Sequence, residues 1–417
     1  MLKKKYLKLI FLLGKILLVL LCGIFMVLYP QVMFNSSLRG LDTWWRIVFP
    51  ALLPFFVISE IFMGLGLVNF LGVLLEPIMR PLFNLPGTSA FVLAVGYTSG
   101  APIGAVLTGK LRKQNLCSKA EASHLMAFTN NASPLFIFGA VAVGMFNNPA
   151  LGTVIAGAHY LANLCVGLTL GLFRGPRLLN SKGNRSQEKL LVRAIRALYQ
   201  ANIADGRPIG KLLGDAVKNS VQTLLILGGF IIIFSVIIEV LNVIGLLGIL
   251  KNFFSLVLSN LQLDDSLLHA LSCGFIEMTI GTKLASETTA NLEQQLLVAS
   301  LILGWLGLSI HAQAISMVAD TDIDVRPYLI GRVLHSIFAV LWLTVLLKFN
   351  SSAVTTNATH FSLLEQPWLY SIHSLINLCL TLLFLLATSF ALLAIRYLKY
   401  TRKILFFTSI YKKINKN

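Results

Sequence analysis

Charged residues are scarce in this chain: only 12% of its 417 residues are Asp, Glu, Lys or Arg, while 56% are hydrophobic. A soluble domain carries about 25% charged residues. The core of a soluble protein of this length could not bury so much apolar surface. The composition, with a mean hydropathy of +0.79, therefore indicates a membrane protein with lipid as its main solvent.

Acidic residues are the scarcer charged class, with 17 Asp and Glu against 34 Lys and Arg and a net charge of +17. Such a balance can mean nucleic-acid binding. Here, however, the basic residues lie between apolar stretches, as they do in the cytoplasmic loops of membrane proteins. We therefore expect the lipid bilayer, and no nucleic acid, as a partner.

Signatures of enzymes and metal sites are absent. The chain has no H-E-x-x-H, Walker A or G-x-S-x-G motif. Its five cysteines include no C-x-x-C pair and are interpreted as small apolar residues. We expect no catalytic residue, no metal and no cofactor, and leave open a coupling proton or Na⁺.

Apolar segments long enough to enter or cross a bilayer are what the chain has in abundance. Lys3, Lys4 and Lys5 precede the first, which is longer than the hydrophobic region of a signal peptide, lacks a cleavage pattern and ends at Pro30. The segments 68–87 and 247–265 are weaker and predict interfacial or hairpin helices. The stronger segments are 9–30, 47–67, 88–109, 123–146, 149–173, 218–246, 266–282, 294–317, 327–348 and 367–395.

Two parts of the chain resemble each other at an offset of 175–176 residues. Asn131-x-Ser133 precedes His159 by the same spacing with which Gly307-x-Ser309 precedes His335. We predict an all-α, polytopic fold with two repeats that contain broken or hairpin helices. The expected parts are 1–46 (anchor helix and external loop), 47–173 (repeat one), 174–217 (basic cytoplasmic linker with an amphipathic surface helix near 186–204), 218–348 (repeat two) and 349–417 (external loop, last helix and basic tail).

Basic residues predict the orientation of each repeat. Twenty-five of the 34 Lys and Arg fall in residues 1–8, 110–119, 174–218 and 396–417, whereas 349–366 has none. The first repeat then runs from outside to inside and the second from inside to outside, with both termini cytoplasmic. Such inverted repeats are the architecture of secondary transporters. The segment 320–326 must then lie inside despite Asp320, Asp322 and Asp324.

Polar residues inside apolar segments are the candidate binding groups. In the first repeat they are Asn130, Asn131 and Ser133, beside the helix-breaking Pro134. These side chains are expected to bind a ligand or ion, or alternatively to bond between packed helices. In the second repeat Ser309, His311 and Gln313 follow Gly307, and they face the same alternatives. The matched His159 and His335 are interpreted as packing residues, with a proton relay as the alternative.

A glycine-rich segment precedes each of these clusters. Gly96, Gly100, Pro102 and Gly104 flank Thr98 and Ser99, and too many helix breakers occur here for a simple helix. Its counterpart carries Glu277, Thr279 and Gly281. Glu277 could stay protonated, pair with Lys283, carry a coupling proton, or simply lie at the membrane edge. The expected substrate-binding residues are Thr98, Ser99, Asn130, Asn131, Ser133, Glu277, Thr279, Ser309, His311 and Gln313, and the expected helix breaks are Gly96, Gly100, Pro102, Gly104, Pro134, Gly281 and Gly307.

The same segments carry a resemblance to a known family. The runs Gly100–Gly104, Phe128–Met145, Gly274–Thr279 and Gly307–Gln313 are similar to those of YlbJ-type sporulation integral membrane proteins. That family contains the nucleoside-recognition gate domain shared with concentrative nucleoside transporters. The resemblance covers about residues 45–348.

The resemblance implies a protein of endospore-forming bacteria that acts late in spore maturation. The family is associated with moving dipicolinic acid from the mother cell across the outer forespore membrane, a substrate that composition and spacing do not indicate. We expect a transporter of a small, polar, anionic metabolite, with oligomerisation of the chain left open. The alternatives are a membrane scaffold for spore-envelope (cortex) assembly, a nucleoside-type transporter and a membrane-embedded enzyme.

Overall fold

Every regular element in the described part of the chain is a helix. The computed structural model describes residues 2–173 and 189–349, and no strand occurs within them. The predicted last helix at 367–395, the loop before it, the basic tail and part of the 174–217 linker lie outside the described residues. The predicted all-α fold is confirmed for the residues described.

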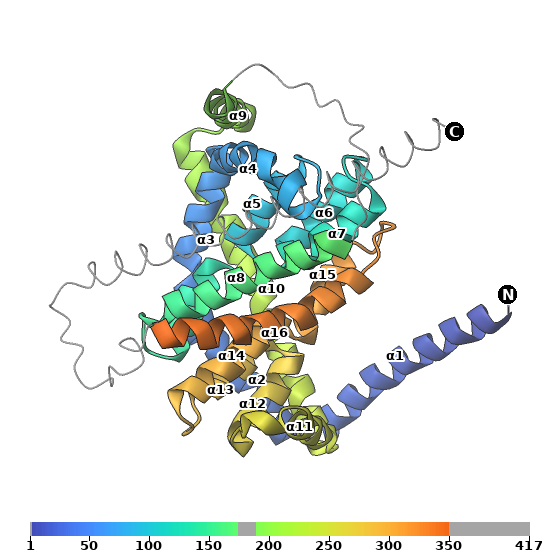
Figure 1. Ribbon diagram of the computed structural model, residues 1–417. Helices are drawn as coiled ribbons and strands as arrows, with labels where there is room; N and C mark the ends of the chain where they lie inside the picture. The colour runs from blue at the N-terminus through green and yellow to red at the C-terminus, as the bar shows by residue number, and fades with distance from the viewer. Residues whose placement is uncertain (1, 174–188, 350–417) are drawn as a thin grey trace, which may run out of the picture.

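The first half of the chain forms two long helical segments around a group of shorter ones (Figure 1). Its elements are α1 (Leu2–Leu28), α2 (Pro30–Thr43), the π-helix η1 (Trp44–Val48), α3 (Phe49–Gly64), α4 (Leu67–Phe83), α5 (Ser89–Ser99), α6 (Ile103–Lys113), α7 (Lys119–Thr129), the π-helix η2 (Phe136–Met145) and α8 (Leu151–Phe173).

The second half repeats the order of α3 to α8 after a connecting helix. Its elements are α9 (Leu190–Asp205), α10 (Ile209–Val243), α11 (Leu246–Val257), the 3₁₀-helix η3 (Ser259–Leu261), α12 (Asp265–Ile276), α13 (Met278–Ser286), α14 (Leu292–Trp305), α15 (Gly307–Met317) and α16 (Arg326–Phe349). Gly66 before α4 and Gly245 before α11 both have left-handed backbone. Figure 1 shows these equivalent helices, α4 and α11, at opposite ends of the molecule.

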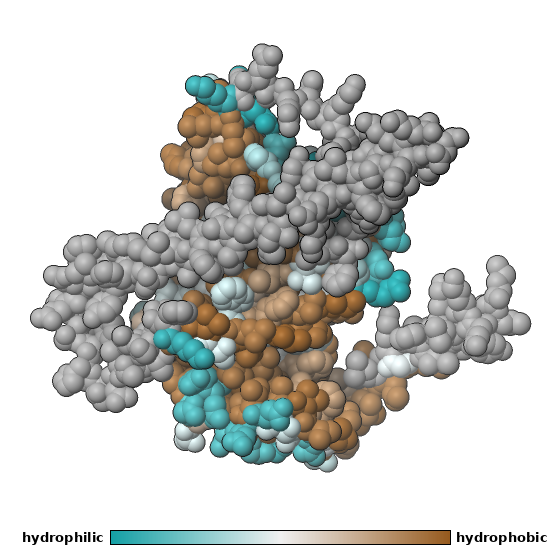
Figure 2. All heavy atoms as spheres, in the orientation of Figure 1, coloured by the Kyte–Doolittle hydropathy of each residue, from teal (hydrophilic) through white to brown (hydrophobic). Residues whose placement is uncertain are grey.

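Five helical segments of the described chain are long and apolar enough to cross a membrane: Pro30–Gly64, Leu151–Gly171, Ile209–Val243, Leu292–Met317 and Arg326–Lys348. In Figure 2, hydrophobic residues cover most of the coloured surface, and hydrophilic residues gather at the top, at the bottom and on the right side of the view. So much exposed apolar surface fits a protein surrounded by lipid.

The segment 31–46 was predicted as a loop, and this prediction was wrong. Pro30 ends α1 but also begins α2, since proline is compatible with the first turn of a helix. The α2 helix then continues through η1 into α3 and packs along α10. Ser36 Oγ donates to the Ser235 carbonyl at 2.8 Å, and Trp44 Nε1 donates to the Leu224 carbonyl at 2.8 Å. These buried contacts fix the helical path.

The helix α9 corresponds to the predicted surface helix at 186–204. It packs on α4, where Arg193 forms a 2.6 Å ion pair with Glu76. Its other face exposes Ile195, Tyr199 and Ile203. An exposed apolar stripe on a short helix beside basic residues is typical of a helix at the membrane surface.

Candidate functional site

The first pair of helix breaks lies between α5 and α6 and between α7 and η2. Residues 130–133 are non-helical, and Pro134 starts the next helical segment instead of breaking the previous one. Asn130 bridges the two breaks: its Oδ1 accepts from the Ala105 amide at 2.8 Å and its Nδ2 donates to the Met126 carbonyl at 2.9 Å. The Ala101 amide donates to the Asn131 carbonyl at 2.8 Å.

Gly100 allows these two breaks to touch. Its φ of +79° is left-handed, and a Cβ there would lie 2.9 Å from the Ser133 amide nitrogen. Pro102 is the N-cap residue of α6, so the break predicted at Gly100 and Pro102 is found. Gly96 and Gly104 were wrongly predicted as breaks. They lie inside α5 and α6, where the absence of a side chain lets both helices approach Thr129 closely.

The second pair of breaks lies between α12 and α13 and between α14 and α15. Glu277 ends α12 and begins α13, and its Oε2 accepts from the Ile280 amide at 2.7 Å. Leu306 and Gly307 break the other helix with φ of +74° and +75°. A Cβ on Gly307 would lie 2.9 Å from the Met278 amide nitrogen. As in the first repeat, the glycine of one break packs against the backbone of the other break.

Two predictions for this region need correction. Gly281 is not a break; it lies inside α13, packed against the backbone of Gly274. The suggested pairing of Glu277 with Lys283 is not found either. Lys283 Nζ instead donates to Thr43 Oγ1 at 3.2 Å and lies 3.8 Å from Glu287, because residues six apart on a helix such as α13 do not face each other.

The segments that follow the four breaks contact one another across the repeats. The α6 helix packs on α15, and α13 packs on η2. Each contact joins a segment of the first repeat to one of the second. Each repeat thus brings its two breaks into contact, and the two repeats pack on each other through these segments. The helices that begin at the breaks carry partial positive charge at their N-termini.

The predicted polar residues divide into bonded and unbonded groups. Thr98 Oγ1 bonds back to the Ala94 carbonyl at 3.0 Å, and Ser133 Oγ accepts from the Phe136 amide at 3.2 Å. Ser99 is partly exposed and Thr279 is buried. Polar side-chain atoms of five of these residues, all buried, have no hydrogen-bond partner in the described structure: both atoms of Asn131, Thr279 Oγ1, Ser309 Oγ, His311 Nε2 and Gln313 Nε2. Buried polar groups are rarely left unbonded, so these five are the strongest binding candidates.

Sequence reasoning missed a buried arginine beside this region. Arg332 of α16 is 0% exposed and donates through Nη2 to the Ala127 carbonyl at 2.6 Å and to Asn163 Oδ1 at 3.1 Å. Asn163 in turn donates to the Phe128 carbonyl at 2.6 Å and to the Tyr97 hydroxyl at 2.9 Å. The signal was available, since an ionisable residue inside an apolar span predicts a functional group.

The matched histidines lie together where α8 and α16 pack side by side. The ring centroids of His159 and His335 are 4.4 Å apart. His335 Nε2 is 2.8 Å from the His159 carbonyl, so that nitrogen is the donor. His159 Nε2 accepts from the Ala132 amide at 3.2 Å and is therefore unprotonated. These bonds hold the 130–133 break, which favours the packing interpretation over the proton relay.

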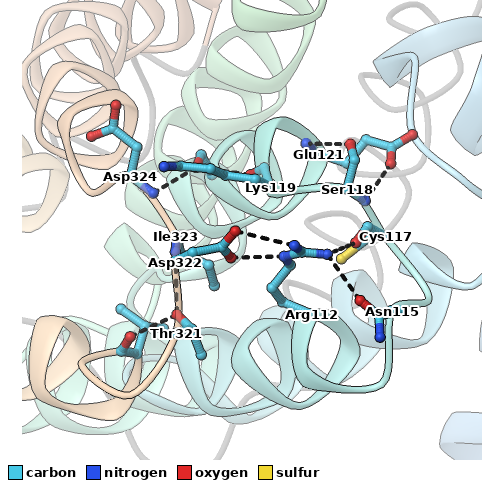
Figure 3. Close-up of polar contacts among 12 residues, drawn as sticks. Arg112, Asn115, Cys117, Ser118, Lys119, Glu121, Thr321, Asp322, Ile323 and Asp324 are labelled. Atoms are coloured by element: carbon cyan, nitrogen blue, oxygen red, sulfur yellow. Dashed lines mark hydrogen bonds and ion pairs between the residues drawn. The ribbon is translucent and has the colours of Figure 1, made fainter.

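The acidic segment 320–326 meets the basic loop 110–119. Arg112 donates to both carboxylate oxygens of Asp322, at 2.8 and 3.1 Å (Figure 3). In the described structure Asp324 forms no ion pair with that loop; its backbone amide donates to Ser123 Oγ. The Arg112 guanidinium lowers the pKa of Asp322 below its ordinary value. The two loops thus lie on one side of the molecule, as the orientation predicted from the basic residues requires.

Comparisons with known proteins identify the family. A family model described as Gate, nucleoside recognition, matches residues 45–157 and 224–322. The sporulation integral membrane protein YlbJ of Bacillus subtilis (strain 168) is 47% identical over 321 residues, covering 77% of this chain and 79% of YlbJ. The chain belongs to the YlbJ family.

Two further similarities are weaker. An uncharacterised protein, BpOF4_10220, of Alkalihalophilus pseudofirmus is 28% identical over 123 residues, covering 28% of this chain and 27% of that protein. The solved structure of CNTnw in an inward-facing substrate-bound state is similar with a TM-score of 0.45 and 11% identity, covering 78% of this chain and 85% of that chain. Membership of the YlbJ family, with its Gate domain, makes this chain a multi-pass integral membrane protein of sporulation.

Proposed function

We propose that this protein carries a small polar anion across a bilayer and that the anion is dipicolinate, moved across the outer forespore membrane. One observation carries the proposal. In each repeat two helix breaks touch each other, and buried polar side chains beside the breaks have no partner in the described structure. Irregular backbone at membrane depth is tolerated where it lines a cavity or binding site, which is how discontinuous helices serve transporters.

The chemistry of the breaks suits an anion. Helix N-termini attract negative charge through the positive end of the helix dipole. The side chains of Asn131, Ser309 and Gln313 can donate hydrogen bonds to a carboxylate or a ring nitrogen. Dipicolinate is a small planar dianion that has carboxylates and a ring nitrogen. Its choice rests on the resemblance to YlbJ-type proteins, and the mother-cell-derived membrane and cytoplasmic termini belong to the same proposal.

Transport by the purified protein in lipid vesicles tests this function. Vesicles containing the protein should accumulate radiolabelled dipicolinate faster than vesicles without it, and unlabelled dipicolinate should compete. Uridine uptake is measured in parallel, because the Gate family is described by nucleoside recognition. Imposed Na⁺ and proton gradients reveal the coupling ion. Uptake of uridine and none of dipicolinate would contradict the proposal and favour the nucleoside-type alternative.

The scaffold alternative depends on α9 and its exposed apolar stripe. Replacing Ile195 and Tyr199 with serine removes part of that stripe and leaves the Arg193–Glu76 ion pair in place. If the protein is a transporter, this variant should retain vesicle uptake. A variant that transports normally but no longer supports spore formation would point to a scaffold role.

A further inference from the structure

Arg332 is a buried positive charge without a carboxylate partner in the described structure. Only its Nη2 is bonded, and both acceptors are neutral oxygens. Its Nε and Nη1 are buried and have no hydrogen-bond partner. Burying an unpaired charge is costly even after the surroundings relax, so a purely structural role would leave much of this cost unbalanced.

The surroundings of Arg332 compensate the charge only in part. The Ala127 carbonyl belongs to the last turn of α7, the negative end of that helix. The ring of Tyr328 lies 5.8 Å from the guanidinium carbon, a contact that favours a cation. Ion pairs elsewhere in the described chain hold their arginines against Asp or Glu, as Arg326 is held by Asp324 at 3.1 Å.

The position of Arg332 connects the two repeats at their breaks. Through Ala127 it touches the helix that ends at the 130–133 break. Through Tyr328, whose hydroxyl lies 2.8 Å from His311 Nδ1, it reaches α15 just after the Gly307 break. A guanidinium offers donors in a planar fork that matches a carboxylate. The guanidinium therefore lies beside the end of α7 and, with Tyr328 between them, close to His311 of the assigned binding site.

We propose that Arg332 binds a carboxylate of the transported anion through its free Nε and Nη1 groups. The inference rests on the proposed function and deepens it, because it makes a carboxylate the recognised group. Hydrogen bonds to Ala127 and Asn163 hold the guanidinium by Nη2 and leave the other donors for the substrate. A neutral substrate of the same shape gains less from this residue, because its amide oxygens carry no charge.

Equilibrium binding to purified, detergent-solubilised protein tests the inference. The probes are dipicolinate and its neutral diamide, pyridine-2,6-dicarboxamide. Arg332→Gln should weaken dipicolinate binding roughly ten- to hundredfold, the range of a lost charge-assisted hydrogen bond, and change diamide binding less than about threefold. Arg326→Gln, which removes an exposed arginine at the start of the same helix, is the matched control and should change neither.

Arg332→Lys keeps the charge and a donor for the Ala127 carbonyl, so it maintains the fold if the glutamine variant does not. It should lose roughly tenfold in dipicolinate affinity because an ammonium lacks the fork. Equal losses of affinity for the diacid and the diamide in Arg332→Gln would overturn the inference, as would wild-type affinity in Arg332→Lys. Either result would show that Arg332 only holds packed helices together. Wild-type protein that does not bind dipicolinate would instead overturn the proposed function.

Discussion

Each repeat makes two breaks at equivalent places, and the two kinds of break are exchanged between the repeats. In the first repeat the α5–α6 break uses Gly100 and the α7–η2 break is bonded by the side chain of Asn130. In the second repeat the α12–α13 break is capped by the Glu277 side chain, and the α14–α15 break uses Gly307. In each repeat a glycine faces a side-chain-stabilised break.

This exchange has a physical reason. Two irregular backbones can touch only if one of them has no Cβ, and the other must find hydrogen bonds for its exposed amides. Either member of the pair can supply the glycine. The two repeats therefore have the same shape with different residues at equivalent positions, and their sequence similarity is low.

Adding a methyl group at the glycines that separate the breaks should have the largest effect. Gly307→Ala and Gly100→Ala place a Cβ on a residue with positive φ, which costs about 1–2 kcal/mol. The added methyl group also crowds backbone atoms of the neighbouring break, which costs about 1–3 kcal/mol. We expect strongly reduced membrane abundance and a lower midpoint of thermal unfolding. Gly248→Ala, at a helical position with no neighbour within 4 Å, is the control. Equal behaviour of all three variants would refute the close approach of the breaks.

The adjacent asparagines should separate folding from binding. Asn130→Ala leaves the Ala105 amide and the Met126 carbonyl unpaired, at about 1–3 kcal/mol each, so its abundance should fall. Asn131→Ala removes no side-chain hydrogen bond of the described structure. It should keep its abundance and lose roughly ten- to hundredfold in dipicolinate affinity if the anion bonds there. Uptake per molecule in the membrane distinguishes the two, and unchanged affinity in Asn131→Ala would assign that residue to packing.

Glu277 tests the capped break of the second repeat with a smaller expected effect. Glu277→Ala removes the acceptor of the Ile280 amide and should cost about 0.5–2 kcal/mol, seen as a lower unfolding midpoint. Glu277→Gln keeps an acceptor and should unfold like wild type. We predict that its transport is nevertheless impaired, because ionisation is lost. Normal uptake by Glu277→Gln at every pH tested would show that Glu277 acts only as a helix cap.

The exposed pair of Arg112 and Asp322 should matter least. Asp322→Asn should lower the unfolding midpoint slightly, and salt should abolish the difference. Since Arg112 lowers the pKa of the folded-state carboxyl, this contribution is present above the ordinary Asp value of about 3.9 and is lost as pH falls through the lowered pKa. Unfolding scans from neutral to acidic pH measure it. A difference that grew as pH fell would contradict the ion pair.

The sequence predicted the all-α membrane class and three of the four break regions, because hydrophobic runs, glycine and proline act locally. The break that lies at Glu277 was predicted at Gly281 instead. In a short apolar segment, a carboxylate that caps a helix cannot be told from an isolated buried charge. It could not separate Asn130 from Asn131, because only the packed structure shows which amide reaches Ala105. Arg332 was overlooked among apolar neighbours, and its partners lie about 170 to 200 residues away in the chain.

The account depends most on the opposite orientation of the two repeats in the membrane, since alternating exposure of one site follows from it. Gln114 after α6 and Thr289 after α13 occupy equivalent, exposed positions, 175 residues apart. Single cysteines at these positions in a cysteine-free background can be labelled in intact cells with a membrane-impermeant maleimide. The account predicts that Thr289→Cys is labelled from outside and Gln114→Cys only after the membrane is opened. Labelling of both from the same side would contradict it.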